Sequence, residues 1–389
     1  MKIVDVAEFY AEQGGGVRTY INQKLEAGAA AGHEVVIIAP GPEDAEEERL
    51  GGRILWVKGP PLPPDPRYYV LWNEAKVHRL LDQERPDVLE GSSPWSGGWF
   101  AARWKGEAAR TFIFHQDPVA VYPQTFLGGA FGAQRVDRLF GWYWAYLRSL
   151  SGRYDATVVS GHWLADRLRG FGLQRPEAVP FGIDKAQFSP ERGTTEMRQR
   201  LLNACGLDGD ARLLVTVSRF HPEKRLGTLL SAFERASAKQ PIGLVIYGDG
   251  PLRGMIRRRA SRIPGVHVAG FTRDRDELST VLASADAMLH GSAAETYGLV
   301  VAEAICSGLP VIAPDVGGAA DLAASEYAET YRPGDALGCA LAIERLLDRD
   351  RDELRAACVE SGTQRIGTMD DHFQGLFRFY EQLVTERRG

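Results

Sequence analysis

The stretch MKIVDVAEFYAEQGGGVRTYINQKLEAGAAAGHEVVIIAP, residues 1–40, decides the fold class of this chain. The apolar run over 2–6 predicts a buried strand, which the glycines at 14–16 break before a helical pattern over about 17–31. A second apolar run over 34–39 follows a short glycine turn. This order of strand, glycine loop, helix and strand predicts a parallel, doubly wound α/β sheet.

The alternation of strands and helices continues and restarts after Gly182. We expect further strands near 87–89, 111–115 and 156–160, and then near 212–218, 243–247, 266–268, 287–289 and 310–312. Residues 40–66 hold acids and then a Pro-rich run, and we expect an exposed excursion there, outside the core. The pattern predicts two Rossmann-like β/α/β domains: an N-terminal domain over 1–185, a C-terminal domain over 186–370, and a C-terminal helix over 371–389 packing back on the first domain.

Composition restricts the class of protein. The chain of 389 residues is 44% hydrophobic and 25% charged, which is typical of a globular protein, and its net charge of −5 argues against a nucleic-acid partner. Its four cysteines lack the spacing of a metal site and favour a reducing compartment. No apolar run approaches the roughly 20 residues of a membrane span. We expect a cytoplasmic protein, and peripheral docking on the inner face of the cytoplasmic membrane stays open.

The segment ETYGLVVAE, residues 295–303, contains the most informative chemical pattern. Glu295 follows a predicted strand, and Gly298 opens a helix whose free amide groups suit a diphosphate. Side chains in a helix lean toward its N-terminus, so Glu303 can approach a ribose hydroxyl while Glu295 meets a sugar. The alternative is a capped surface helix with two incidental acids.

Two further loops carry polar or flexible residues at strand ends. Arg219 and Lys224 lie five residues apart and can reach one diphosphate from one loop, where cations stabilise a leaving nucleotide. A solvated charge cluster is the alternative. Gly248 and Gly250 form a turn at the carboxyl end of a strand, where open α/β sheets bind ligands. Phe271 is a candidate aromatic wall for the base, or simply a core residue.

Five motifs in this order resemble those of the retaining glycosyltransferases of family 4, which share the two-domain B-type glycosyltransferase fold, and the resemblance covers nearly the whole chain. They are Val179-Pro-Phe-Gly-Ile-Asp184, Val217-Ser-Arg-Phe-His-Pro-Glu-Lys224, Gly248-Asp-Gly-Pro251, Gly270-Phe271 and the pair Glu295/Glu303. The resemblance implies that the catalytic residues are His115, Arg219, Lys224 and Glu295. It implies that the donor is bound by Gly15, Gly16, Gly248, Gly250, Phe271, Tyr297, Gly298, Leu299 and Glu303.

The first domain offers weaker candidates. The glycines at 14–16 permit close approach of the backbone to a sugar diphosphate, but they do not form the GxGxxG pattern of dinucleotide sites. Arg18 and Tyr20 either face the cleft or lie on a solvated helix. The resemblance implies that His115, at the end of a predicted strand, lies near the sugar hydroxyls. Asp117 then accepts a proton from the acceptor hydroxyl or orients His115.

Two segments look like metal motifs. Asp274-Arg-Asp276 and Asp348-Arg-Asp350 resemble the Asp-X-Asp of metal-dependent glycosyltransferases. The first precedes a predicted helix, and acids in a first helical turn are favoured by the helix dipole. We therefore expect no metal and no cofactor.

The resemblance implies transfer of a sugar from a nucleoside diphosphate sugar with retention of configuration. The departing phosphate would help to deprotonate the acceptor in a front-face displacement, and domain closure would exclude water. A UDP-sugar is favoured on family frequency, with GDP-mannose as the alternative donor. A sugar-nucleotide epimerase, a glycan phosphorylase and a non-catalytic binding subunit are the rival functions.

The stretch over 122–172 points to the acceptor. It contains Phe126-Leu-Gly-Gly-Ala-Phe131 and Trp142-Tyr-Trp-Ala-Tyr146. The overlapping range from 135 to 175 has seven arginines against three acids. Aromatic residues interleaved with arginines suit an anionic membrane surface. The stretch resembles the lipid-acting branch of the family, the diacylglycerol mannosyl- and sulfoquinovosyltransferases, which implies a diacylglycerol- or ceramide-type acceptor. Buried core aromatics, and a polysaccharide or small-molecule acceptor, are the alternatives.

Overall fold

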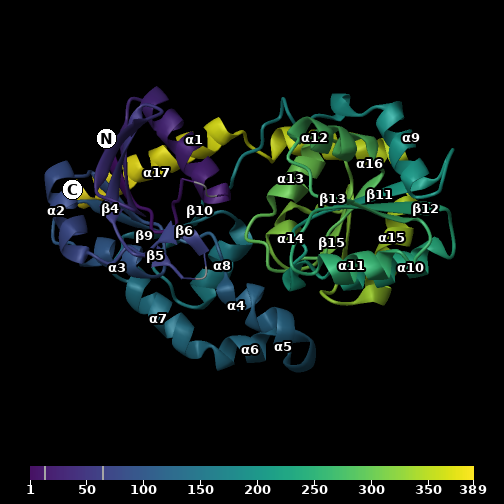
Figure 1. The fold of residues 1–389 in the computed structure, drawn as a ribbon, viewed down its shortest axis with the longest axis horizontal. Coiled ribbons are helices and arrows are strands. Elements are labelled where there is room, and N and C mark those ends of the chain that lie inside the picture. The colour runs from purple at the N-terminus through teal and green to yellow at the C-terminus, as the bar shows by residue number, and fades with distance from the viewer. Residues whose placement is uncertain (13–14, 64) are drawn as a thin grey trace.

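The computed structural model of the protein describes residues 1–12, 15–63 and 65–389. Two sheets, each covered by helices, lie next to each other along the long axis of the molecule (Figure 1). The predicted α/β class with two Rossmann-like sheets is confirmed. Among the helices of the described ranges, none combines the length and the hydropathy that crossing a bilayer requires.

The first sheet has the strand order β10-β9-β8-β7-β1-β2-β4-β3. All of its neighbouring strands run parallel except β3, which is antiparallel to β4 at the edge. Its strands are β1 (Lys2–Val6), β2 (Glu34–Gly41), β3 (Ala45–Arg49), β4 (Gly52–Lys58), β7 (Val88–Gly91), β8 (Ala109–Ile113), β9 (Ala156–Val159) and β10 (Pro176–Ala178). The winding reverses between β1 and β7, which are neighbours in space.

The expectation of an exposed excursion over 40–66 is wrong for its central part. Strand β4 pairs in parallel with β2, and Ile54, Leu55 and Val57 are buried. The run Ile-Leu-Trp-Val has enough apolar surface to form a strand inside the sheet. The acidic stretch before it is the edge strand β3, where charged side chains discourage pairing with another chain. The Pro-rich part belongs to a separate hairpin of β5 (Pro61–Leu62) and β6 (Asp65–Tyr69).

The last helix, α17 (Met369–Arg388), belongs to the core of the first domain. Its residues Phe373, Leu376 and Tyr380 share one buried cluster with Ile3 of β1, and Figure 1 shows α17 (yellow) running past α1. Such burial contributes about 1.5–3 kcal/mol for each large apolar side chain. The other helices on this sheet are α1 (Gly16–Ala30), α2 (Glu74–Glu84), α3 (Ser96–Arg103) and α8 (His162–Gly170).

The chain therefore crosses between the sheets twice, and the two crossings touch. The backbone N–H of Ile183 donates to the carbonyl of Gly367 at 2.9 Å. Gly182 lies so close to Thr368 that an added Cβ would be 2.0 Å from its backbone. Because the two crossings are packed together, their contact does not locate a boundary. The domain boundaries near 185 and 370 therefore stay a prediction.

The second sheet has the order β13-β12-β11-β14-β15-β16, all parallel. Its strands are β11 (Arg212–Val217), β12 (Ile242–Tyr247), β13 (Val266–Gly270), β14 (Ala287–Leu289), β15 (Val311–Pro314) and β16 (Ala328–Tyr331). Its helices are α9 (Thr195–Ala204), α10 (Leu226–Ser237), α11 (Arg253–Ala260), α12 (Arg275–Ser284), α13 (Leu299–Cys306), α14 (Gly318–Leu322), α15 (Ala336–Leu347) and α16 (Arg351–Gln364). This is the doubly wound order in which ligands bind where the winding reverses, here between β11 and β14.

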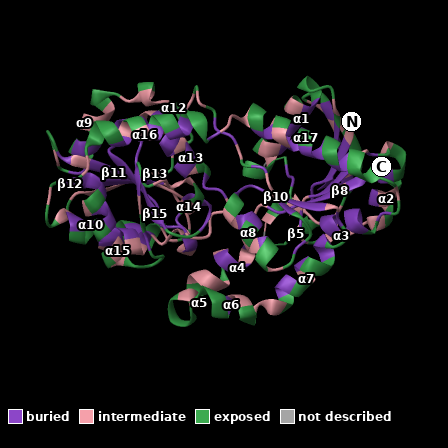
Figure 2. Ribbon diagram, turned by 180° about the vertical axis from the view of Figure 1, so that it is seen from behind, coloured by how far each residue is buried: buried purple, intermediate pink, exposed green. Residues whose placement is uncertain are grey.

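A group of four helices, which we call the arm, projects from the first domain (Figure 1). The arm comprises α4 (Pro118–Val121), α5 (Pro123–Phe131), α6 (Ala133–Leu139) and α7 (Gly141–Ser151). Helix α5 has no buried residue, and Figure 2 shows exposed stretches on α5 and α6. Of the two tryptophans predicted for a membrane contact, Trp142 is 68% exposed, whereas Trp144 is buried and stacks on Phe171.

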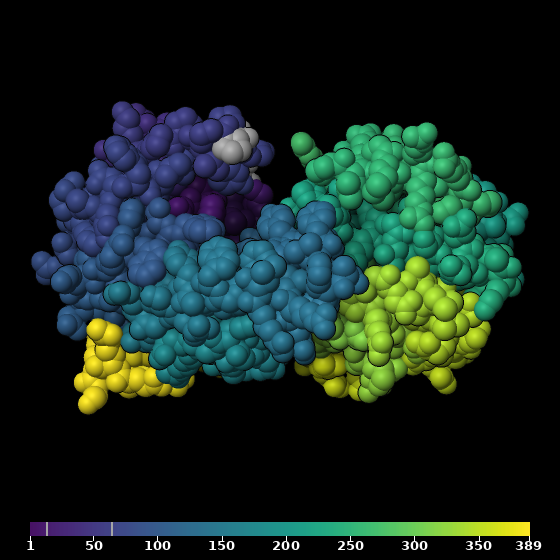
Figure 3. Space-filling model, turned by 90° about the horizontal axis from the view of Figure 1, so that it is seen from below, coloured from purple at the N-terminus to yellow at the C-terminus, as the bar shows by residue number. Residues whose placement is uncertain are grey.

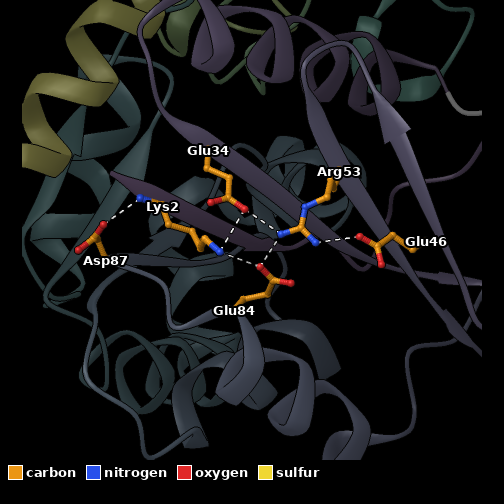
Figure 4. A network of polar contacts seen from close by, with 6 residues as sticks. All are labelled: Lys2, Glu34, Glu46, Arg53, Glu84 and Asp87. Atoms are coloured by element: carbon orange, nitrogen blue, oxygen red, sulfur yellow. Dashed lines mark hydrogen bonds and ion pairs between the residues drawn. The ribbon is translucent and has the colours of Figure 1, made fainter.

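At the amino ends of the first-sheet strands, charged residues form a network (Figure 4). Lys2 pairs with Glu34 and Glu84 at 3.1 Å each, and Arg53 pairs with Glu34, Glu84 and Glu46 at 2.7–2.8 Å. The network joins the starts of β1, β2 and β4 to β3 and the end of α2. Single surface pairs contribute little, and the network lies at the edge of the sheet opposite the carboxyl ends where ligands bind.

Candidate active site

A cavity of about 900 Å³ opens at the carboxyl edge of the second sheet. Its volume is within the roughly 300–1,000 Å³ typical of small-molecule sites. Every second-domain residue predicted for the site lines it: Arg219, Lys224, Gly248, Gly250, Phe271, Glu295, Tyr297, Gly298, Leu299 and Glu303. The structure thus brings these residues together at the reversal point of the sheet, while their individual roles stay predictions.

Lys224 and Glu295 form an ion pair on the cavity wall, with the Lys224 ammonium donating to Glu295 Oε1. Lys224 follows β11 and Glu295 follows β14, so the pair spans the two strands between which the winding reverses. Burial alone would raise the pKa of Glu295, but the charge of Lys224, with His290 and Arg219, lowers it overall. Glu295 therefore stays ionised.

Arg219 supplies an available cation beside this pair. Its side chain is 72% exposed and its guanidinium is 3.7 Å from Glu223, a long contact within one loop. Both Arg219 and Lys224 face the same cavity. Arg219 and Lys224 place two cations beside Glu295, where a dianionic diphosphate can pair with them, and the acids Asp249 and Glu303 also line the cavity.

Helix α13 begins at this cavity. Gly298 is its N-terminal capping residue, with φ of +94°, a left-handed conformation that a side chain disfavours. Leu299 and Val300 are the first helical residues on the cavity wall, so the free N–H groups of the first turn lie beside Lys224 and Glu295. Gly248 also lines the cavity. Its backbone packs tightly against Ser218, because a Cβ at this position would be 1.8 Å from the Ser218 carbonyl oxygen.

Glu303 lies one turn further along α13 and pairs with Arg275 at 3.0 Å. Burial raises the pKa of Glu303 above its usual range, although Arg275 acts against this. The Arg275 side chain is 60% exposed, so a ligand hydroxyl can replace it at low cost. A carboxylate in this position can accept hydrogen bonds from two neighbouring hydroxyl groups, as a ribose presents.

Among the described residues of the glycine loop, Gly15 and Gly16 do not line this cavity. Gly14 lies outside the described residues. Gly15 caps α1 and Gly16 is its first residue; at each, an added Cβ would have no atom within 4 Å. Arg18 has a buried Nε with no hydrogen-bond partner among the described residues. Tyr20 points inward, with its hydroxyl 3.1 Å from His372 Nε2.

His115 lies beside the cavity, separated from it by Phe181. Its ring packs against Tyr20 and Phe181 with centroid distances of 5.9 and 5.0 Å, and Phe181 lines the cavity. Its carbonyl accepts a hydrogen bond from Thr296 of the second domain at 2.8 Å. Burial lowers the pKa of His115 to about 3, so the ring is neutral. Within the described ranges, neither ring nitrogen has a hydrogen-bond partner.

Asp117 has a structural role in this conformation. Its carboxylate accepts from the backbone N–H groups of Val119 and Ala120 at 2.9 and 3.0 Å and pairs with Arg167 at 2.5 Å. It is fully buried and makes no hydrogen bond to His115 in the part of the chain that the structure describes. The expectation that Asp117 orients His115 is therefore not met, because the carboxylate is already used to cap α4.

The two Asp-X-Asp segments are helix starts. Asp274 caps α12 by accepting from the backbone N–H groups of Asp276 and Glu277, and Asp350 caps α16 in the same way. Across residues 1–12, 15–63 and 65–389, no cluster of three or more His, Cys, Asp or Glu side chains is arranged to hold a metal. The acids of these segments serve the ends of helices.

The sequence analysis missed His290. It follows β14, is buried, and has Nε2 3.7 Å from Glu295 Oε1. Burial lowers its pKa to about 4, despite the nearby carboxylate, so the ring is neutral. A histidine directly after a buried strand is the same signal that marked His115, and it was available in the sequence.

Solved structures of glycosyltransferases share the fold. The sucrose-phosphate synthase of Thermosynechococcus elongatus aligns with a TM-score of 0.74 and 20% identity, covering 99% of this chain and 100% of that one. A glycosyltransferase of Rickettsia africae aligns with a TM-score of 0.72 and 14% identity, covering 98% of each chain. The chain therefore has the two-domain B-type fold that these structures share.

Sequence comparison identifies the family. The chain matches the description "Glycosyltransferase Family 4" over residues 14–187 and "Glycosyl transferases group 1" over residues 197–365. It is 31% identical to a GDP-mannose-dependent alpha-mannosyltransferase of Mycobacterium tuberculosis, covering 83% of this chain and 81% of the relative. It is 27% identical to the sulfoquinovosyl transferase SQD2 of Arabidopsis thaliana, covering 86% and 64%. The chain belongs to the family-4 glycosyltransferases, and the predicted resemblance is confirmed.

Proposed function

We propose that this glycosyltransferase moves a hexose from a nucleoside diphosphate sugar to a hydroxyl of a membrane lipid, with retention and without a metal ion. The bond between the sugar C1 and the diphosphate oxygen breaks as C1 bonds to the acceptor oxygen on the same face. The acceptor proton passes to the departing diphosphate, so the products are a glycolipid and a nucleoside diphosphate. The observation that carries this proposal is the pair of cations, Arg219 and Lys224, that line the cavity at the reversal point of the second sheet.

The charged side chains of that cavity support a binding mode for the donor. In the proposal, Arg219, Lys224 and the first turn of α13 bind the diphosphate, whose charge grows as the glycosidic bond breaks. Glu303 binds the ribose and Phe271, 65% exposed on the cavity wall, lies against the base. Glu295 contacts the sugar, and closure of the domains would move His115 toward the sugar hydroxyls.

We take GDP-mannose as the first donor to test, with UDP-sugars second. Relatives that share about 30% identity over most of this chain are named GDP-mannose-dependent mannosyltransferases. Family frequency instead suggests a UDP-sugar. A protein of similar fold, which was solved in complex with UDP and glucose, supports that alternative. The lining of the base region, with Phe271 and Thr272, is compatible with either base.

The arm supports a lipid acceptor. Phe126, Phe131, Leu139 and Trp142 are exposed on it, next to the exposed residues Arg135 and Arg138. Exposed apolar side chains among arginines suit a bilayer surface. There the apolar side chains can enter the acyl region while the arginines contact anionic headgroups. One relative is named for a phosphatidylinositol dimannoside and another is named a monoglucosyldiacylglycerol synthase. We therefore propose peripheral docking of the arm on an anionic leaflet.

The test is transfer from labelled GDP-mannose, and separately from labelled UDP-glucose, to anionic vesicles that contain diacylglycerol or phosphatidylinositol. We expect a lipid-soluble product whose new linkage has the anomeric configuration of the donor, as measured by NMR. A product with inverted configuration would refute retention. Efficient transfer to water-soluble saccharides, with none to vesicles, would refute the lipid acceptor and leave the donor site intact.

A further inference from the structure

The second domain contains a basic segment whose arginines do not line the donor cavity. Residues 250–273 include six arginines and no aspartate or glutamate, in a chain whose net charge is −5. The segment covers α11, the turn after it and β13. An uninterrupted excess of one charge destabilises a surface unless an oppositely charged partner compensates it.

The arginines of this segment are concentrated on the outward face of α11. Ile256 and Ala260 are buried and define the inward face of the helix. By the helical period, Met255 and Arg258 lie on the opposite face, and Arg262 continues that face in the next turn. All three are exposed, and Met255 is 55% exposed. The outward face thus combines an apolar side chain with cations.

These cations are largely available to a partner. Arg253 pairs with Asp249 at 3.1 Å, and Arg259 donates to Ser231 of α10. For the remaining members of the segment, no carboxylate of the described residues lies within ion-pair distance; they are Arg257, Arg258, Arg262 and Arg273, all exposed. These four exposed guanidinium groups have no ion-pair partner among the described residues.

Helix α11 lies on the same side of the molecule as the arm. In Figure 1, α11 lies in the lower part of the second domain, on the side toward which α5 and α6 project. Figure 3 views the molecule from that side and shows the arm (blue) with the green segments of the second domain beyond it. The arm and α11 therefore both lie toward the lower side of the molecule in Figure 1.

We propose that α11 and the turn at Arg262 form a second membrane contact, so that both domains rest on one anionic bilayer. The inference rests on the proposed docking of the arm and extends it to the second domain. Phosphates of lipid headgroups match the guanidinium groups, and Met255 inserts among them as the apolar residues of the arm do. An exposed apolar side chain among cations, which the arm also presents, favours lipid over a soluble polyanion.

The test is co-sedimentation of the full chain with vesicles of phosphatidylglycerol and phosphatidylcholine. The variant Arg258→Ser/Arg262→Ser should bind about 30-fold more weakly, because each basic residue near an anionic bilayer contributes about 1 kcal/mol. Its thermal unfolding and its affinity for GDP should equal those of the wild type. The charge-retaining variant Arg258→Lys/Arg262→Lys should bind as the wild type does.

The matched control is Arg365→Ser/Arg378→Ser. These arginines are also exposed and belong to the end of α16 and to α17, which lie in the upper half of Figure 1. We expect this control to bind vesicles like the wild type. An equal loss in the control would mean that total charge, and not this face, governs binding, and would overturn the proposal.

The arm variant Arg135→Ser/Arg138→Ser distinguishes docking by the arm from the additional contact at α11. Weaker binding in both the arm variant and the α11 variant supports the proposal. Weaker binding in the arm variant alone overturns the α11 contact and leaves the proposed function intact. A wild type that ignores anionic vesicles overturns both. Loss of heparin binding in the α11 variant, with unchanged vesicle binding, assigns the face to a soluble polyanion and overturns the membrane contact.

Discussion

The two sheets reverse their winding at equivalent places, between β1 and β7 in the first and between β11 and β14 in the second. In the first sheet, Asp5 and Glu90 face each other in register and both contact Lys24 of α1, with Lys24 Nζ 3.0 Å from Asp5. All three side chains are buried. In the second sheet, the corresponding ion pair of Lys224 and Glu295 lies on the wall of the cavity.

Topology therefore locates a candidate site, and the burial of its charges decides whether ligands can use it. Around Lys24, burial lowers its pKa, but the two carboxylates raise it overall and keep it charged. Burial raises the pKa of Glu90 to about 7. These three groups pair with one another inside the protein. Lys224 and Arg219 retain access to water and can exchange their contacts for a diphosphate.

The largest effect should come from breaking the buried cluster. Lys24→Met leaves Asp5 and Glu90 side by side without a cation, and removing one partner of a buried pair costs about 3–5 kcal/mol. Urea unfolding should report this loss of stability. The variant Lys24→Met/Asp5→Asn/Glu90→Gln removes the charges together and should recover most of it. A loss below about 1 kcal/mol in the single variant would contradict the structural role.

On the cavity side, Lys224→Ala and Arg219→Ala should each lower turnover by roughly 10²-fold or more, the scale of losing an electrostatic contact to the transition state. Unfolding free energies should change little, unlike those of Lys24→Met. Lys239→Ala is the matched control, since Lys239 is exposed and pairs with Glu344 away from the cavity. Wild-type turnover in both variants would remove these residues from the mechanism.

Substitutions of the two cavity glutamates should have smaller effects that differ from each other. Glu295→Gln should lower turnover, whereas Glu303→Gln should weaken binding of the free nucleoside diphosphate by about 10-fold. Because the pKa of Glu303 is raised, it takes up a proton as the pH falls, and nucleotide affinity should fall with it. Titration calorimetry from pH 7.5 to about 5 checks this; a Glu303→Gln variant with unchanged affinity would exclude the ribose contact.

The smallest effect should follow removal of metal ions. If Arg219, Lys224 and the start of α13 neutralise the diphosphate, enzyme treated with EDTA should keep most of its activity. Turnover before and after chelation, with added Mn²⁺ as the comparison, measures this. Complete loss that Mn²⁺ restores would mean that the cations of the second sheet do not suffice.

The sequence predicted the cavity well because its residues follow strand ends within short motifs. The ends of parallel strands share one edge, so Lys224 and Glu295 had to approach each other once the strands were located. What failed depends on packing between distant segments. Asp117 is used by α4 and Arg167, and the burial of Trp144 against Phe171 follows from how α7 meets α8. Periodicity alone does not encode these partners.

The strand β4 was missed for a different reason. Its apolar run is short and lies between an acidic stretch and a Pro-rich stretch, and both neighbours are typical of surface loops. The four residues Ile54 to Val57 are sufficient for a strand once β2 offers a parallel partner. The prediction followed the local composition, because a single sequence does not show that this segment pairs with β2.

The return of α17 to the first sheet has a consequence for biosynthesis. Translation is vectorial, and domains generally fold as they leave the ribosome. Here the first domain to be synthesised lacks part of its core, supplied by Phe373, Leu376 and Tyr380, until the last 20-residue helix has emerged. The second domain has every one of its strands and can fold earlier. The order of folding during synthesis should therefore be the reverse of the order along the chain.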